Sequence, residues 1–152
     1  GGRLIDGIKG GELIRKNGFR TFIPTGGMCA SSCAVAFIGG EYRTISGTGR
    51  VLVHAPYIKN SYDPSIYEFY KTMKSEIVCS GDIKQLNEYF VKMLGKEDGE
   101  FIYQQSINYC SESSGWNFNK EAAALYNIDN TKEFLESDYV KKYNLIRPEY
   151  DS

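Results

Sequence analysis

The sequence is short of the residues that build metal and cofactor sites. Its 152 residues include one histidine, His54, and four cysteines. Cys29 and Cys33 are close in sequence, but zinc needs two further ligands and no second pair of this kind is present. We therefore expect neither a metal centre nor a cofactor.

An excess of charge of one sign is also missing. Lys and Arg number 18, Asp and Glu number 19, and the formal net charge is -1. Because there is no basic excess, the sequence does not indicate a nucleic-acid partner. No apolar run approaches the length of a membrane span, and the chain contains no internal repeat or low-complexity linker.

The length fits one domain over residues 1–152, which is large enough to bury its own core. The chain starts abruptly at Gly1 and shows no signal peptide. We expect an excised, N-terminally truncated domain, so the missing signal gives no information about the compartment.

Strand and helix patterns alternate in the first half, and helical patterns dominate the second. The first half predicts a helix over 8–16, a strand over 20–24, a helix over 31–38 and strands over 42–46 and 50–54. The second half predicts helices over 66–77 and 83–94, a strand over 116–118, a helix over 121–126 capped by Asn119, and one or two short helices over 132–144. This order predicts an α/β fold with a mostly parallel sheet, whose first strand we expect just before Gly1.

The apolar stripes over 66–77 and 83–94 exceed what one small sheet should cover. They are typical of core or subunit contacts, and they predict a self-associating protein.

The stretch from Gly26 to Gly40 carries the chemistry. It opens with glycines, places Ser31 and Ser32 between two cysteines, and continues with small apolar residues, as in a helix packed tightly on a sheet. Either serine can act as an N-cap. Alternatively, one of them can use the free N–H groups of the helix N-terminus to stabilise an anion.

These pieces, in order, resemble the proteolytic subunit of Clp protease and its bacterial extracytoplasmic relatives, which have the crotonase-like fold. The resemblance rests on the Gly1-Gly2 pair, the Cys29-Ala30-Ser31-Ser32-Cys33 motif and the strand ending in Val53-His54. It also covers, more weakly, residues 86–96 and 119–128. A ββα spiral and a peptide or protein substrate follow from this resemblance.

The resemblance assigns catalytic roles. Ser31 matches the nucleophile, His54 the general base, and the backbone amides of Gly2 and Ser32 the oxyanion hole. A serine needs such a base, and a neutral imidazole can act as one near neutral pH. Ser31 is preferred to Ser32 because its distance from Gly2 matches the family without a gap.

The third member of the triad departs from the family, which has an aspartate in the loop before the helix at 121–126. The loop here contains no aspartate, its only carboxylate is Glu112, and the matching position falls near Ser114 or Gly115. The site is therefore a Ser–His dyad, a triad completed by Glu112, or a decayed enzyme. Loss of the orienting carboxylate can cost a serine protease about 10⁴ in rate.

Three other functions compete with peptide hydrolysis. The fold can serve as a non-catalytic binding or assembly module. Acyl-CoA chemistry, as in other crotonase relatives, depends on residues other than a Ser–His pair. A redox site at Cys29 and Cys33 would lack the usual CxxC spacing.

The cysteines of the motif are similar to those of the extracytoplasmic relatives, and the resemblance therefore implies a periplasmic or other extracytoplasmic location. In an oxidising compartment we expect at least one disulfide, with Cys79 and Cys110 the most available because both lie near loops. The sequence identifies no unfoldase partner.

Overall fold

The structure is a computed structural model, and it describes residues 2–59, 77–79, 83–110 and 115–131. The expected helices over 66–77 and 132–144 lie outside these residues, apart from the last residue of the first. Within the described part of the chain, no helix is long and apolar enough to cross a membrane.

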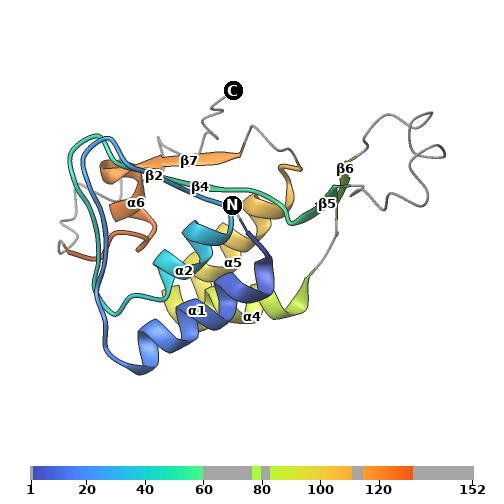
Figure 1. Cartoon of the computed structure of the whole chain (residues 1–152), viewed down its shortest axis with the longest axis horizontal. Coiled ribbons are helices and arrows are strands. Elements are labelled where there is room, and N and C mark those ends of the chain that lie inside the picture. Colours follow the sequence, from blue (N-terminus) through green and yellow to red (C-terminus); the bar gives the residue numbers. More distant parts are fainter. Residues whose placement is uncertain (1, 60–76, 80–82, 111–114, 132–152) are drawn as a thin grey trace.

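The first half alternates helices and short strands, as the sequence pattern predicts (Figure 1). The elements are α1 (Leu4–Lys16), β1 (Thr21–Ile23), β2 (Met28–Ala30), α2 (Ser32–Ile38), β3 (Arg43–Ile45) and β4 (Arg50–Val53). The strand β2 was not expected. It is three residues long and follows two glycines, so it carries too little alternation to be recognised in the sequence.

The second half contains β5 (Tyr57–Lys59), β6 (Ile77–Cys79), α4 (Lys84–Leu94), α5 (Lys96–Ile107), β7 (Trp116–Asn119) and α6 (Lys120–Leu125). The expected cap of α6 is confirmed, because Asn119 Oδ1 accepts a hydrogen bond of 2.8 Å from the Ala122 amide. Three elements were not expected: β5, β6 and α5. Ile77, the expected end of a helix, instead begins β6.

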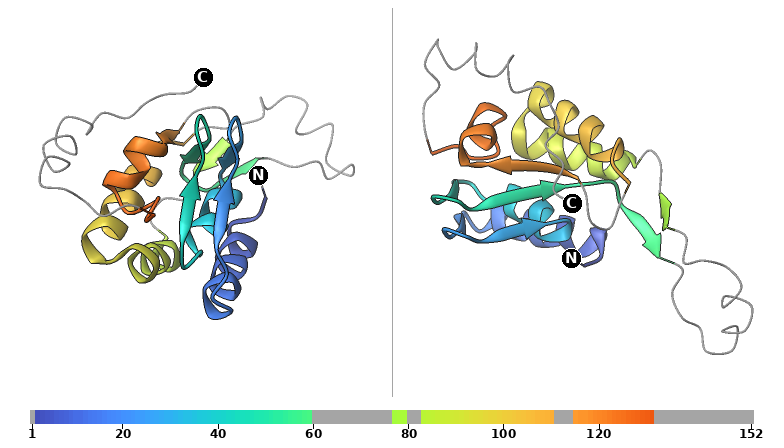
Figure 2. Two further views of the ribbon diagram at one scale, coloured as in Figure 1. Left: turned by 90° about the vertical axis from the view of Figure 1, so that its left-hand side faces the viewer. Right: turned by 90° about the horizontal axis from the view of Figure 1, so that it is seen from above.

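Two ladders are parallel: β1 pairs with β3, and β2 pairs with β4. On its other side β4 pairs antiparallel with β7, so the order is β2-β4-β7. The right panel of Figure 2 shows these three strands next to one another. The strands β5 and β6 form a further antiparallel ladder. The predicted α/β fold is confirmed, but the described ladders are two parallel and two antiparallel rather than mostly parallel.

Helices α1, α2, α4 and α5 lie on one side of this sheet (Figure 1). The stripe of α4 is buried there, with Leu86, Phe90, Met93 and Leu94 no more than 4% exposed. This stripe therefore belongs to the core of the chain itself. Near it, the Phe101 ring stacks on Tyr126, with ring centres 4.9 Å apart.

A glycine explains why α5 was difficult to recognise. Gly99 lies within α5, and glycine weakens a helical prediction. A Cβ at this position would lie 2.5 Å from the Val91 Cα of α4. Glycine therefore permits the close approach of the two helices, a tertiary reason that a local pattern does not contain.

Candidate active site

Ser31 lies at the turn between β2 and α2. Its amide donates to the Leu52 carbonyl of β4 at 3.0 Å, and its carbonyl accepts from the Val35 amide of α2 at 3.1 Å. Its backbone has φ 61° and ψ -124°, a conformation that L-residues rarely adopt. Such strain costs on the order of 1–3 kcal/mol and gathers at functional sites.

The N-cap explanation for Ser31 is not supported by the geometry. Ser31 occupies the N-cap position of α2, but its side chain makes no cap hydrogen bond. Nucleophilic serines of α/β hydrolases lie on a sharp strand-to-helix turn of this kind.

Gly2 and Ser32 lie together beside this turn. A Cβ on Gly2 would be 3.4 Å from the Ser32 Cβ and Oγ, and the Gly2 φ of 153° favours glycine. The Ser32 hydroxyl donates to the Arg3 carbonyl at 3.0 Å. The Ser32 side chain is thus engaged in structure, and its main-chain N–H belongs to the first turn of α2, where helices leave donors without an intrahelical partner.

His54 follows β4 directly, on the strand next to Ser31. The β2–β4 register pairs Ala30 with Leu52, so both chains leave the sheet at its same edge. Neighbouring strands are about 4.8 Å apart. The structure thus places Gly2 beside Ser32, and it places Ser31 and His54 just after the neighbouring strands β2 and β4, at the same edge of the sheet.

The ring of His54 is oriented by the main chain. Its Nδ1 lies 2.8 Å from the Ala55 carbonyl oxygen. Because a carbonyl oxygen can only accept, Nδ1 carries the hydrogen in this contact. The lone pair is then on Nε2, the nitrogen that a general base would use toward a serine hydroxyl.

Residues before and after the loop that contains Glu112 lie against His54 and its neighbour Ala55. The Ala55 amide donates to the Tyr109 carbonyl at 2.7 Å. A Cβ on Gly115 would be 3.1 Å from the His54 Cβ. Glu112 itself lies outside the described residues, so its role stays a prediction.

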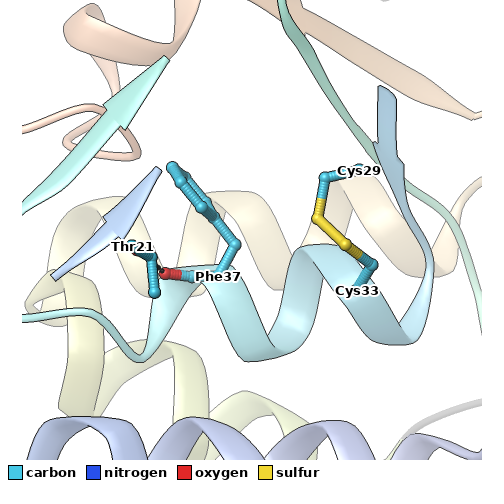
Figure 3. Close-up of a disulfide and its surroundings, with 4 residues drawn as sticks. All are labelled: Thr21, Cys29, Cys33 and Phe37. Carbon is cyan, nitrogen blue, oxygen red and sulfur yellow. Dashed lines mark hydrogen bonds between the residues drawn. A yellow bond between two sulfur atoms is a disulfide. The ribbon is translucent and has the colours of Figure 1, made fainter. Parts of the chain in front are cut away.

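A disulfide brackets the candidate nucleophile. Cys29, two residues before Ser31, is bonded to Cys33, two residues after it (Figure 3). The expectation of at least one disulfide is met by this pair, which the sequence reasoning did not choose. Cys110 is disulfide-bonded as well. Cys29 lies in β2, a strand that the sequence pattern did not predict.

The disulfide lines an apolar cavity of about 350 Å³, which also contacts Phe22, Met28 and Phe37. Phe22 and Met28 are 62% and 50% exposed. Among the described residues, no group of three or more His, Cys, Asp or Glu side chains is placed to hold a metal ion.

Comparisons with known proteins support the fold. No family model matches the chain, and no curated protein matches it. Among solved structures, it is similar to a serine-to-alanine mutant of the 1510-N membrane-bound stomatin-specific protease, with a TM-score of 0.55 and 15% identity over 97% of this chain and 67% of that one. A lysine-to-alanine mutant of this protease in complex with a substrate peptide gives a TM-score of 0.51 and 15% identity over 97% of this chain and 63% of that one.

The chain thus spans about two thirds of the length of these neighbours. The likeness shows that the chain has the Clp-protease-like α/β fold, as the sequence motifs implied. At 15% identity it does not assign the catalytic residues or a compartment.

Proposed function

We propose that the chain is a serine peptidase-like hydrolase with Ser31 as its nucleophile and His54 as its base. The observation that carries this proposal is the backbone of Ser31, which adopts a costly conformation at the end of β2 without using its hydroxyl as a cap. The neighbour in complex with a substrate peptide supports a peptide as the substrate class.

In the proposed reaction, Ser31 Oγ attacks the carbonyl carbon of the substrate and His54 Nε2 takes the hydroxyl proton. The amides of Ser32 and Gly2 stabilise the oxyanion that forms. The proton then passes to the leaving amine, the C–N bond breaks, and an acyl-enzyme remains. Water, activated by the same imidazole, releases the acid and restores Ser31.

We favour a dyad over a triad, because the Ala55 carbonyl already accepts from the imidazole. Glu112 remains the candidate carboxylate for a triad. The competing function, a non-catalytic binding or assembly module on the same fold, is favoured by the glycine at position 115, near which the family has its aspartate.

A fluorophosphonate probe tests the proposal. Ser31→Ala should abolish labelling, while circular dichroism shows an unchanged fold. Ser32→Ala is the matched control and should retain most labelling, because its proposed contribution is the main chain. His54→Ala should slow labelling strongly, since the hydroxyl loses its base.

Two results would contradict these assignments. Labelling that survives Ser31→Ala but disappears in Ser32→Ala would assign the nucleophile to Ser32 instead of Ser31. An intact wild-type protein that takes up no probe would favour the binding module.

An extracytoplasmic, periplasmic location remains part of the proposal. It is supported by the Cys29–Cys33 disulfide and by the bonded Cys110, since disulfides persist in oxidising compartments. Mass spectrometry of protein taken from its native compartment, alkylated without reductant, should find no free thiol. Four free thiols would contradict this location.

Self-association also stays a prediction. The apolar stripe of α4 does not support it, because that stripe is buried in the core of the chain. Exposed apolar side chains on α1 and β1, such as Leu13 and Phe22, support it. Light scattering should show more than the monomer mass at tens of micromolar, roughly where a weak interface fills. A monomer at that concentration would contradict it.

A further inference from the structure

The Cys29–Cys33 disulfide closes a small ring whose middle residue is Ser31. One end of the ring is fixed in the sheet, because Cys29 is 5% exposed and pairs with Val51 of β4. The other end lies in the first turn of α2. The bond therefore joins β2 to the first turn of α2 (Figure 3), across the turn that contains Ser31.

The Ser31 turn needs such a restraint. A backbone at φ 61° and ψ -124° persists only where its surroundings over-determine it. The hydrogen bonds from Ser31 to Leu52 and from Val35 to Ser31 supply part of that restraint. The disulfide supplies a covalent part, because it fixes the distance between Cys29 and Cys33, which lie two residues before and two residues after Ser31.

The far end of α2 is held independently. Thr21 Oγ1 donates to the Phe37 carbonyl at 2.7 Å, in the last turn of the helix (Figure 3). The helix is thus attached to β1 at one end and to β2 at the other. Loss of the disulfide would free the N-terminal end, which carries Ser31, while the C-terminal end stays in place.

The disulfide is accessible to a reductant. Cys33 is exposed, and both cysteines line the apolar cavity of about 350 Å³. A thiolate can approach the Cys33 sulfur and displace the Cys29 sulfur, which leaves as a thiolate and takes a proton from water. A second thiol of the same reductant then releases Cys33, so that two electrons pass from a dithiol to the protein.

We propose that the Cys29–Cys33 disulfide is a positioning device for Ser31, and that a dithiol which reduces it lowers the reactivity of the serine. This inference rests on the proposed function. A misplacement of about 1 Å can cost 100-fold in rate. We expect reduction to slow the reaction of Ser31 about 10- to 100-fold, by this argument, while the fold remains.

The test compares fluorophosphonate labelling rates of the oxidised protein, the protein treated with dithiothreitol, and the same sample after reoxidation. Labelling should slow on reduction and recover on reoxidation. The Cys29→Ser/Cys33→Ser double variant should label slowly and show no response to dithiothreitol.

Two variants separate this bond from other effects. Cys110→Ser removes another disulfide-bonded cysteine, and labelling of this variant should keep the full response to dithiothreitol. Thr21→Val loosens the opposite end of α2, and it should lower stability while keeping the response. Equal labelling rates for the oxidised and reduced wild-type protein would overturn the inference and leave the proposed function intact.

Amide hydrogen exchange gives a readout that does not need activity. Reduction should speed exchange at the Ser31 and Val35 amides, whose acceptors hold the turn, but not at amides within β4. If the oxidised protein takes up no probe and these amides still respond, the proposed function fails and the positioning role stands. Unchanged exchange at both amides would refute the positioning role.

Discussion

Gly115 lies directly opposite His54 across the β4–β7 pair. The register pairs Val53 with Trp116, and a Cβ on Gly115 would overlap the Val53 carbonyl oxygen and lie 3.1 Å from the His54 Cβ. Gly115, one of the two positions near which the resemblance places the family's aspartate, is therefore closed to any side chain. This closure, together with the Ala55 carbonyl on Nδ1, explains how a histidine can be oriented here without a carboxylate at that place.

We predict that Gly115→Ala destabilises the fold. The added methyl meets backbone, which cannot rotate away, and overpacking of this kind costs about 1–3 kcal/mol. Urea denaturation should show a lower midpoint. Because β4 must shift to relieve the overlap, probe labelling of Ser31 should slow as well. A variant with unchanged midpoint and unchanged labelling would contradict the close packing of Gly115 on His54.

Glu112→Gln tests the choice between dyad and triad. With the Ala55 carbonyl as the orienting group, labelling should change by less than about threefold, within the scatter expected for a substitution that removes no interaction of the site. If Glu112 completes a triad, labelling should instead fall by orders of magnitude, up to about 10⁴. Glu97→Gln, which changes a carboxylate in the first turn of α5, serves as the matched control.

The sequence predicted those parts of the fold whose signals are local. Asn119 correctly marked the start of α6, and Gly95 correctly marked the end of α4. The continuous apolar run in 50–54 predicted a strand, and its residues Val51, Leu52 and Val53 are all buried. These signals survive because caps and apolar periodicity act within a few residues.

The features that the sequence did not predict depend on contacts between residues that are distant in sequence. The turn at Ser31 forms because β2 pairs with β4, and Met28-Cys29-Ala30 alone does not indicate a strand. The disulfide partner of Cys33 follows from that turn, so the sequence could not choose it. The five site residues were obtained from the resemblance rather than from any local pattern. The structure places Gly2 beside Ser32, and Ser31 and His54 at the same edge of the sheet.

Asp129 should make the protein sensitive to acid. Its side chain is 1% exposed, accepts from the Ile45 amide at 2.9 Å and from the Thr131 hydroxyl at 2.6 Å, and pairs with Lys120 at 3.3 Å. Burial raises the pKa of Asp129, but these hydrogen bonds and the Lys120 charge outweigh it, so its pKa lies below the ordinary value.

A pKa lowered by folding stabilises the native state above the unfolded pKa of about 3.9. That contribution is lost as the pH falls through the folded value. Asp129→Asn should therefore cost about 1.5–3 kcal/mol at pH 7, the value of a hydrogen bond to a charged group. The difference from wild type should shrink below pH 4. Glu88→Gln, which removes an exposed ion pair with Lys84, should leave the urea midpoint unchanged.

Two adjacent glycines of α1 should respond to alanine in opposite directions. A Cβ on Gly10 would meet only the Ala36 Cβ at 4.0 Å, an ordinary contact. Gly10→Ala should therefore stabilise the helix by about 0.5–1 kcal/mol. A Cβ on Gly11 would overlap the hydroxyl of buried Tyr89, which donates to the Val35 carbonyl.

Gly11→Ala should therefore displace Tyr89, leave the Val35 carbonyl without this donor, and destabilise the protein by about 1–3 kcal/mol. Val35 also donates its amide to the Ser31 carbonyl, so the displacement reaches the turn that presents the serine. We expect Gly11→Ala to slow probe labelling and Gly10→Ala to leave it unchanged. Thermal unfolding in which both variants shift in the same direction would show that Tyr89 does not pack on α1 at Gly11.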